Sequence, residues 1–365
     1  MLSTTLSTDK VQGPEAKRLR LRFLVFALLW GLLPVSIVTA LFVGPMDLGV
    51  GDVFKILAAG LIGGDAELGK AAQVVIWEIR LPRVLLSALV GCGLAMAGAA
   101  MQGVFRNALA DPGIIGVSGG GAIGAIAMIV LGNRLISQEF MDNFGLYVVP
   151  VAAMVGAIAM TFLIYKLSLQ NGQVNLISML LVGVAINALG GAFIGFLTFI
   201  ASDDELRTLT FWSLGSLGRA NWDLITPALI FMVLPLFLIP RYANALNALL
   251  LSESDARNLG INVPHVKRNL IALSASLVGV TVALCGGIGF IALVAPHMIR
   301  SSIGPDHRNL IPASGLLGAI ILAFGDVGAR TLAAPAELPI GILTAFIGAP
   351  VFLYILNKWK RSSGF

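Results

Sequence analysis

The sequence predicts an all-α, polytopic membrane protein with ten transmembrane helices. Composition is the first observation behind this prediction. Of the 365 residues, 57% are hydrophobic and 12% are charged, whereas soluble domains carry about 25% charged residues. The mean hydropathy is +0.92, and the 42 glycines suit membrane helices, in which Gly is more frequent than in soluble ones. Most of the chain is therefore expected to lie in lipid.

The lengths of the apolar segments are the second observation. Eight segments are long enough to cross a bilayer: residues 23–43, 76–102, 147–169, 174–200, 223–240, 267–288, 308–329 and 338–357. Two shorter ones, 114–131 and 289–300, are flanked by polar turns. We predict an N-terminal arm at 1–22, a single transmembrane domain at 23–358 and a C-terminal tail at 359–365.

The distribution of Lys and Arg predicts the orientation. Ten spans place both termini on one side of the membrane. If that side is the cytoplasm, 16 of the 24 Lys and Arg residues lie inside and 8 lie outside. Cytoplasmic loops carry the excess of positive charge in membrane proteins. Both termini are therefore predicted to be cytoplasmic.

Three of the arginines on the side that this count makes extracellular lie at the ends of long spans. Arg80 and Arg83 open the second span, and Arg330 closes the ninth. Long cationic stems at the membrane interface would explain them, as would a pair between Arg330 and Asp326 one helical turn away. The alternative is a cationic rim that receives an acidic partner.

Two loops carry short predicted helices. In the outer loop 201–219, acidic residues from Asp203 onward suit a helix N-terminus. The arginine that follows them, Arg207, either belongs to a segment of aromatic residues at the membrane interface or binds an anionic substrate. In the inner loop, Ser252 or Ser254 can begin a short helix that Gly260 ends. This segment, about 252–263, suits docking of a cytoplasmic partner, although a plain connecting turn would also explain it.

The sequence indicates no catalytic, cofactor or metal site. Residues 64–71 come close to a phosphate-binding loop, but Ala71 replaces the hydroxyl residue that would hold Mg²⁺. ATP, if used, must therefore bind another polypeptide. The three histidines lack metal-ligand spacing. We expect a protein that is not an enzyme.

Several motifs in order resemble permeases of the FecCD type, the membrane subunits of ABC importers for ferric siderophores, haem and cobalamin. The resemblance covers nearly the whole chain beyond the N-terminal arm, and Ala108 is one departure, where many members have Pro. The motifs that carry it are RLPR at 80–83, GAAMQGVFRNALADPGIIGVSGG at 98–120, DARNLGIN at 255–262, GFIALVAPHMIR at 289–300, GPDHR at 304–308 and AELPIGILTAFIGAPVF at 336–352.

The resemblance implies a homodimer in the bacterial inner membrane with the substrate path at the dimer interface. It also implies two cytoplasmic ATP-binding subunits and a periplasmic or lipid-anchored substrate-binding protein. Matching the family residue by residue assigns three roles. Docking of the binding protein falls to Arg80, Arg83 and Arg330, contact with the ATPase to Asp255, Ala256, Leu259 and Gly260, and the pathway to Asn187 and Arg207.

The cargo suggested by the resemblance is an iron chelate, with haem favoured over a ferric siderophore. A cobalamin importer is the alternative. An ion-coupled secondary transporter is a further alternative, but it requires a relay of ionisable groups in the membrane. Only Asp326 meets that requirement.

Overall fold

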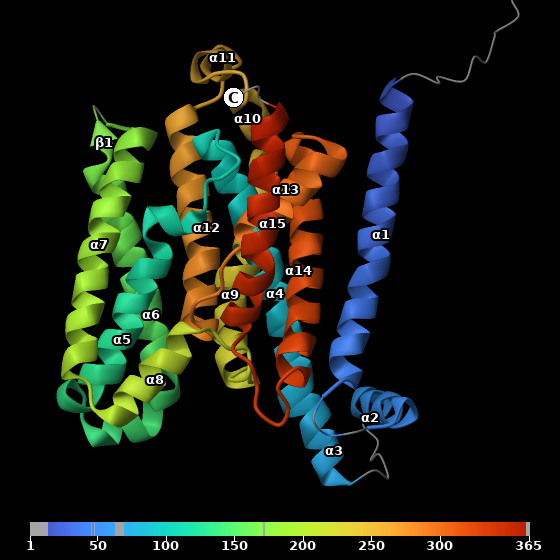
Figure 1. The fold of residues 1–365 in the computed structure, drawn as a ribbon, viewed down its shortest axis with the longest axis vertical. Coiled ribbons are helices and arrows are strands. Elements are labelled where there is room, and N and C mark those ends of the chain that lie inside the picture. Colours follow the sequence, from blue (N-terminus) through green and yellow to red (C-terminus); the bar gives the residue numbers. More distant parts are fainter. Residues whose placement is uncertain (1–13, 45, 47, 63–68, 171, 363–365) are drawn as a thin grey trace, which may run out of the picture.

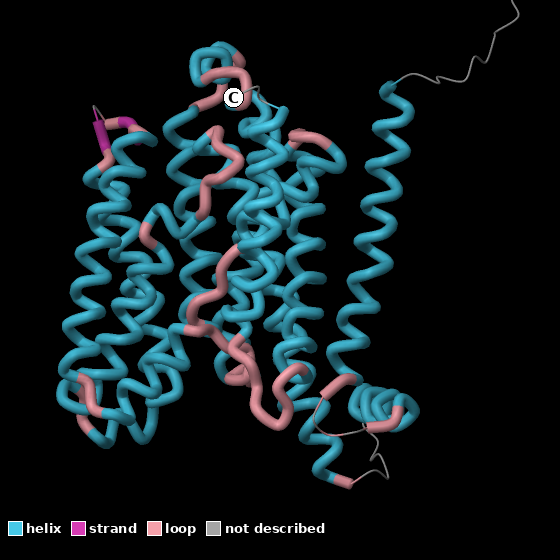
Figure 2. Tube along the Cα trace, in the orientation of Figure 1, coloured by secondary structure: helices cyan, strands magenta, loops and turns pink. Residues whose placement is uncertain are grey.

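The computed structural model describes residues 14–44, 46, 48–62, 69–170 and 172–362. Long helices run side by side through these residues (Figures 1 and 2). Strand pairing in the described part is limited to a two-residue hairpin, β1 (Leu169–Gln170) with β2 (Gln173–Val174). The all-α prediction is confirmed. Residues 63–68, which hold most of the loop at 64–71, lie outside the described part.

Eight helices or helix runs among the described residues are long and apolar enough to cross a membrane. They are α1 (Pro14–Phe42), the run of α3 (Lys70–Val74), η1 (Val75–Arg80) and α4 (Leu81–Phe105), α5 (Val117–Leu135), α6 (Gln138–Leu167), α7 (Leu176–Ile200), the run of α9 (Trp222–Leu238), η3 (Ile239–Tyr242) and α10 (Ala243–Leu249), α12 (Val263–Cys285) and α14 (His307–Thr331). Two further apolar helices, α13 (Ile291–Ile303) and α15 (Ile340–Ser362), match the predicted segments 289–300 and 338–357. The count of ten spans stays a prediction.

Short helices mark the two ends of the bundle. The first residues of α1, the last residues of α15 and α11 (Glu253–Asn258) lie together at one end, at the top of Figure 1. At the opposite end lie α2 (Val50–Ile62), α3 and α8 (Asp203–Ser213). We call these the α11 end and the α8 end. The shared position of the chain ends agrees with an even number of crossings, and the charge count predicts that the α11 end is cytoplasmic.

Small residues bring α4 and α14 into backbone contact. A Cβ atom built on Gly318 would stand 2.2 Å from the carbonyl oxygen of Gly91, and one built on Gly91 would stand 2.2 Å from that of Gly318. The same arrangement joins α5 and α6, where Gly120 and Gly156 face each other at 2.3 and 2.2 Å. Apolar association contributes little in lipid, so such close backbone packing holds membrane helices together. The Gly- and Ala-rich sequence of α4 therefore places this helix in the core.

Three chain segments interlock beside the start of α15. After α12 the chain turns through Gly286, whose φ of +72° suits glycine. The carbonyl of Cys285 accepts a hydrogen bond of 2.8 Å from Ser216 N. The segment after α8 also bonds to the first residue of α15, because Ile340 N donates a hydrogen bond to Gly215 O at 3.0 Å. The first turn of α15 is thus held by the segment after α8.

Candidate functional site

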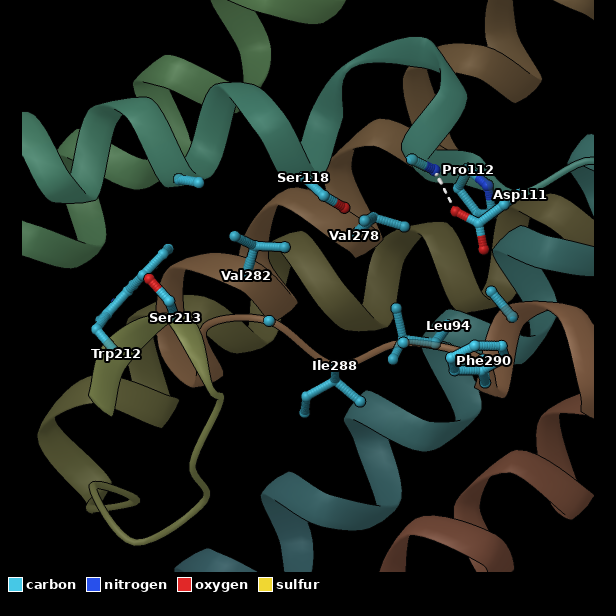
Figure 3. A pocket seen from close by; sticks show the side chains of 15 residues that line it. Leu94, Asp111, Pro112, Ser118, Trp212, Ser213, Val278, Val282, Ile288 and Phe290 are labelled. Atoms are coloured by element: carbon cyan, nitrogen blue, oxygen red, sulfur yellow. Dashed lines mark hydrogen bonds between the residues drawn. The ribbon is translucent and has the colours of Figure 1, made fainter. Parts of the chain in front are cut away.

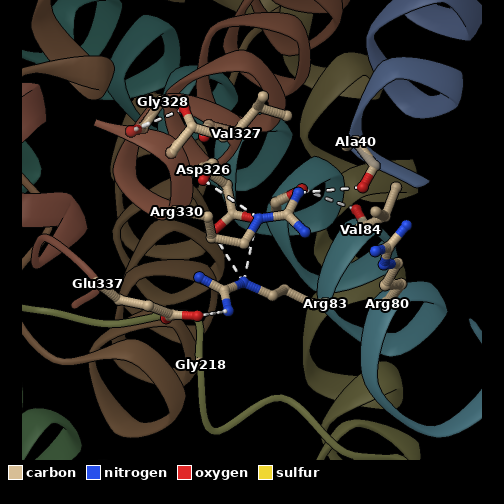
Figure 4. Close-up of polar contacts among 12 residues, drawn as sticks. Ala40, Arg80, Arg83, Val84, Gly218, Asp326, Val327, Gly328, Arg330 and Glu337 are labelled. Atoms are coloured by element: carbon tan, nitrogen blue, oxygen red, sulfur yellow. Dashed lines mark hydrogen bonds and ion pairs between the residues drawn. The ribbon is translucent and has the colours of Figure 1, made fainter. Parts of the chain in front are cut away.

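A buried ion cluster lies between α4 and α14 (Figure 4). Asp326, only 1% exposed, accepts a hydrogen bond from Arg83 Nε at 3.0 Å. It also forms an ion pair with Arg330, whose Nε lies 3.2 Å from the carboxylate. Glu337, on the loop that leads to α15, accepts from Arg83 Nη1 at 2.9 Å. Two arginines and two carboxylates balance each other in charge, which offsets the desolvation cost that burying single charges would carry.

Arg80 has different surroundings from those of the other two arginines. It ends the π-helical turn η1, and its guanidinium donates to the carbonyls of Leu41 and Phe42 at the end of α1, at 2.7 and 2.9 Å. A third bond goes to Met46 O. Cations suit a helix C-terminus, where carbonyl groups lack partners within the helix. Arg80 therefore ties α1 to the start of α4.

All three arginines predicted to form a docking rim are buried in this chain. Arg80, Arg83 and Arg330 are 2%, 6% and 4% exposed. The pairing of Arg330 with Asp326 is confirmed, because the two lie one turn apart on α14. The residue that sequence reasoning missed is Glu337, whose side chain is 41% exposed. It stands in the AELPIG motif but was given no role there. Docking at the arginines stays a prediction.

The segment predicted to meet an ATPase is a short helix at the α11 end. Ser252 caps it by accepting from Asp255 N at 2.9 Å, and Gly260 follows its last turn with a φ of +81°. Both boundaries agree with the sequence prediction. Asp255 and Gly260 are exposed, Ala256 is buried and Leu259 is 66% exposed. An ion pair between Glu253 and the buried Lys267 fixes this helix to α12.

The two predicted pathway residues lie on different helices, α7 and α8. Asn187 is half-buried on α7, and its Oδ1 would stand 2.6 Å from a Cβ atom on Gly119 of α5. Arg207 is exposed on α8, whose N-terminus is closed by a capping box of Ser202 and Glu205. The predicted helix start is therefore confirmed. Arg207 forms no ion pair among the described residues.

A partly open cavity of about 330 Å³ lies between α4, α5, α8 and the turn after α12 (Figure 3). Trp212 and Ser213 line one end, and Asp111 lines the other. Asp111 accepts from Gly113 N at 2.6 Å, and burial raises the pKa of its carboxyl group. Neither Asn187 nor Arg207 lines this cavity. Within the described residues, no group of three or more His, Cys, Asp or Glu side chains could hold a metal ion.

Comparison with known proteins identifies the family. The model of the FecCD transport family matches residues 32–358. The chain belongs to the FecCD transport family. It is 47% identical over 293 residues to the hemin transport system permease protein HmuU of Yersinia pestis, covering 79% of this chain and 85% of that protein. It is 41% identical to the cobalamin import system permease protein BtuC of Halobacterium salinarum, covering 79% and 74%.

Two further matches extend the FecCD assignment. The iron(3+)-hydroxamate import system permease protein FhuG of Bacillus subtilis is 36% identical, with 78% of this chain and 84% of that protein covered. A solved structure of an inward-facing metal-chelate type ABC transporter superposes with a TM-score of 0.78 at 32% identity. That match covers 92% of this chain and 99% of the other. The FecCD resemblance and the importer-permease fold are confirmed, and the chain is an ABC transporter permease.

Proposed function

We propose that this FecCD permease carries an iron chelate, with haem as the preferred cargo, across the bacterial inner membrane. The observation that favours haem is the degree of identity, 47% to a hemin permease against 41% and 36% to cobalamin and hydroxamate permeases. A ferric siderophore is the second cargo within this proposal. A cobalamin permease is the alternative function, favoured by the 41% match.

Transport by reconstituted complexes tests the cargo. Proteoliposomes holding the permease with its ATP-binding subunits and substrate-binding protein are expected to accumulate haem in an ATP-dependent manner. Ferric hydroxamate and cobalamin, supplied one at a time, are the comparison cargoes. Preferential uptake of cobalamin would transfer the assignment to the alternative. Uptake that follows the membrane potential without ATP would instead indicate an ion-coupled transporter.

ATP hydrolysis is proposed to reside on two separate cytoplasmic subunits. The permease purified alone is expected to release no phosphate from ATP in a colorimetric assay, because its near-match to a phosphate-binding loop lacks the Mg²⁺-binding hydroxyl. Adding the ATP-binding subunits should bring activity. Phosphate release that tracks the permease through several purification steps, with no second polypeptide present, would contradict this proposal.

We place two copies of the chain side by side around the pathway, with both termini in the cytoplasm. In this arrangement Asn187 of α7 and Arg207 of α8 belong to the region that the substrate passes. Apolar side chains on α7 leave one face of this helix uncovered in the single chain, among them Leu181, Val184 and Phe199 at 68%, 69% and 87% exposure. Lipid and the second copy are the two surfaces that would cover it.

At the α11 end, the exposed Leu259 is proposed to insert into a groove of the ATP-binding subunit, with Asp255 and Gly260 beside it. Ala256 is the buried residue of α11 and packs this helix against the rest of the permease. The ion pair of Glu253 with Lys267 would pass a movement of α11 on to α12. A tight link of this kind is what coupling of ATP hydrolysis to helix movement requires.

Leu259→Asp is expected to weaken assembly with the ATP-binding subunit about tenfold or more, because a charge replaces an apolar anchor at the interface. The amount of subunit retained on immobilised permease measures the effect. Leu135→Asp is the matched control, since Leu135 is 72% exposed but ends α5, away from α11 (Figure 1). Equal loss in both variants would remove Leu259 from the proposed contact.

At the α8 end, an acidic binding protein is proposed to dock over Arg83 and Arg330. Arg80 supports this surface by holding the end of α1 against α4. Arginine suits this role because its guanidinium can engage two carboxylates at once through different edges. Arg83 already does so with Asp326 and Glu337.

A further inference from the structure

Glu337 is the solvent-facing member of the ion cluster. The Nε edge of Arg83 faces Asp326 at 3.0 Å, and its Nη1 faces Glu337 at 2.9 Å. The side chain of Asp326 is 1% exposed, whereas that of Glu337 is 41% exposed. The carboxylate of Glu337 therefore occupies the guanidinium edge that is nearest to solvent. An acidic side chain approaching Arg83 from solvent would therefore meet Glu337 first.

A second cation, Arg219, lines the same cleft as Glu337. Glu337 and Arg219 both line a cleft of about 200 Å³, together with Ser216 and Trp212. Arg219 is exposed and forms no ion pair among the described residues. In this cleft the Glu337 side chain has room to move, and Arg219 is a second cation with which it could pair.

We propose that Glu337 is an internal competitor for Arg83, which the docking partner displaces toward Arg219. This inference rests on the docking proposed above and names how that docking proceeds. The charges around Arg83 favour such an exchange. Its guanidinium already holds the carboxylates of Asp326 and Glu337, so a partner carboxylate arriving there would place a third negative charge beside one largely buried cation, which is costly. Transfer of Glu337 to Arg219 keeps both sites paired.

The position of Glu337 in the chain connects this exchange to α15. Leu338 N donates to Ala329 O of α14 at 2.9 Å, and Ile340 N donates to Gly215 O at 3.0 Å. Glu337 thus lies on the short segment that leads directly into the first turn of α15. Two alternative ion pairs for one carboxylate form a two-state element of the kind that converts a local contact into helix movement.

Binding of the purified substrate-binding protein of the same transport system tests this inference. The permease complex, held in nanodiscs, is immobilised and titrated at low and at physiological salt. Glu337→Gln is expected to bind the partner about fivefold more tightly, since the competing ion pair is gone. Arg219→Gln is expected to bind it about fivefold more weakly, because displaced Glu337 has no second partner. In the double variant, the effect of Arg219→Gln should disappear.

Two controls separate this exchange from a general effect of net charge. Glu78→Gln and Arg134→Gln make the same substitutions at exposed residues of η1 and α5 that form no ion pair. Neither should reproduce the fivefold changes. Equal effects from the controls, or additive effects in the double variant, would overturn the inference.

The outcome at Arg83 shows which proposal fails. Arg83→Lys keeps a positive charge beside Asp326 but lacks the forked geometry needed for a second carboxylate. If Arg83→Lys lowers partner binding while Glu337→Gln leaves it unchanged, the exchange is wrong and the docking surface stands. If Arg83→Lys binds the partner like the unaltered protein, the docking surface itself is wrong.

Discussion

Asp326→Asn is expected to destabilise the protein by about 3–5 kcal/mol, the usual cost of removing one partner from a buried ion pair. In the native chain Asp326 pairs with both Arg83 and Arg330. After the substitution, Arg83 would keep Glu337, but Arg330 would keep only neutral acceptors such as the carbonyl oxygen of Ala40 at 3.0 Å. A buried guanidinium without a carboxylate is the source of the loss.

Unfolding in mixed detergent micelles, followed by far-UV circular dichroism, measures this loss. Glu337→Gln is the matched control, because it removes the other carboxylate of the cluster from a side chain that is 41% exposed. We expect that control to cost less than about 1 kcal/mol. If the two variants unfold alike, Asp326 is not the central partner of the cluster.

Gly318→Ala is expected to destabilise the protein by about 3 kcal/mol, at the upper end of the range for overpacking. The added methyl carbon would stand 2.2 Å from the carbonyl oxygen of Gly91 and 2.6 Å from the side chain of Ala95. A backbone carbonyl in the middle of α4 cannot move aside as a flexible side chain can. The two helices must therefore separate, and the contacts along their whole seam weaken.

Gly31→Ala in α1 provides a control of opposite sign. Apart from the adjacent backbone of α1 itself, no atom lies within 4 Å of a Cβ built at this position. The substitution should leave packing unchanged and gain up to about 1 kcal/mol from the better helix propensity of Ala. The same unfolding measurement compares the two variants. A stabilised Gly318→Ala protein would show that α4 and α14 do not touch at this seam.

Local sequence patterns predicted those parts of the site that depend on near neighbours in the chain. The start and end of α11 follow from Ser252 and Gly260, because a cap and a left-handed residue act within one helical turn. The pair of Arg330 with Asp326 likewise follows from their spacing on one helix. The apolar segments and the motifs indicated a membrane permease of this family before any contact was known.

Contacts between distant segments could not be predicted in this way. Arg83 and Asp326 are 243 positions apart, and Arg83 and Glu337 are 254 apart, so neither pair leaves a periodic signal. The same limit applies to Arg80, which ends η1 but caps α1. Their positions in the sequence left these arginines either as cationic stems at the membrane interface or as a cationic rim, whereas the packed helices enclose them.

Composition and motif order were thus sufficient to establish a helical membrane permease, because hydropathy and turn chemistry act over one helix at a time. Helix packing decided the rest. It determined that Gly91 meets Gly318, that two arginines share one aspartate, and that Glu337 stands between Arg83 and solvent. The physical reason is that an ion pair or a backbone contact depends on distance in space, and only the folded bundle brings these segments together.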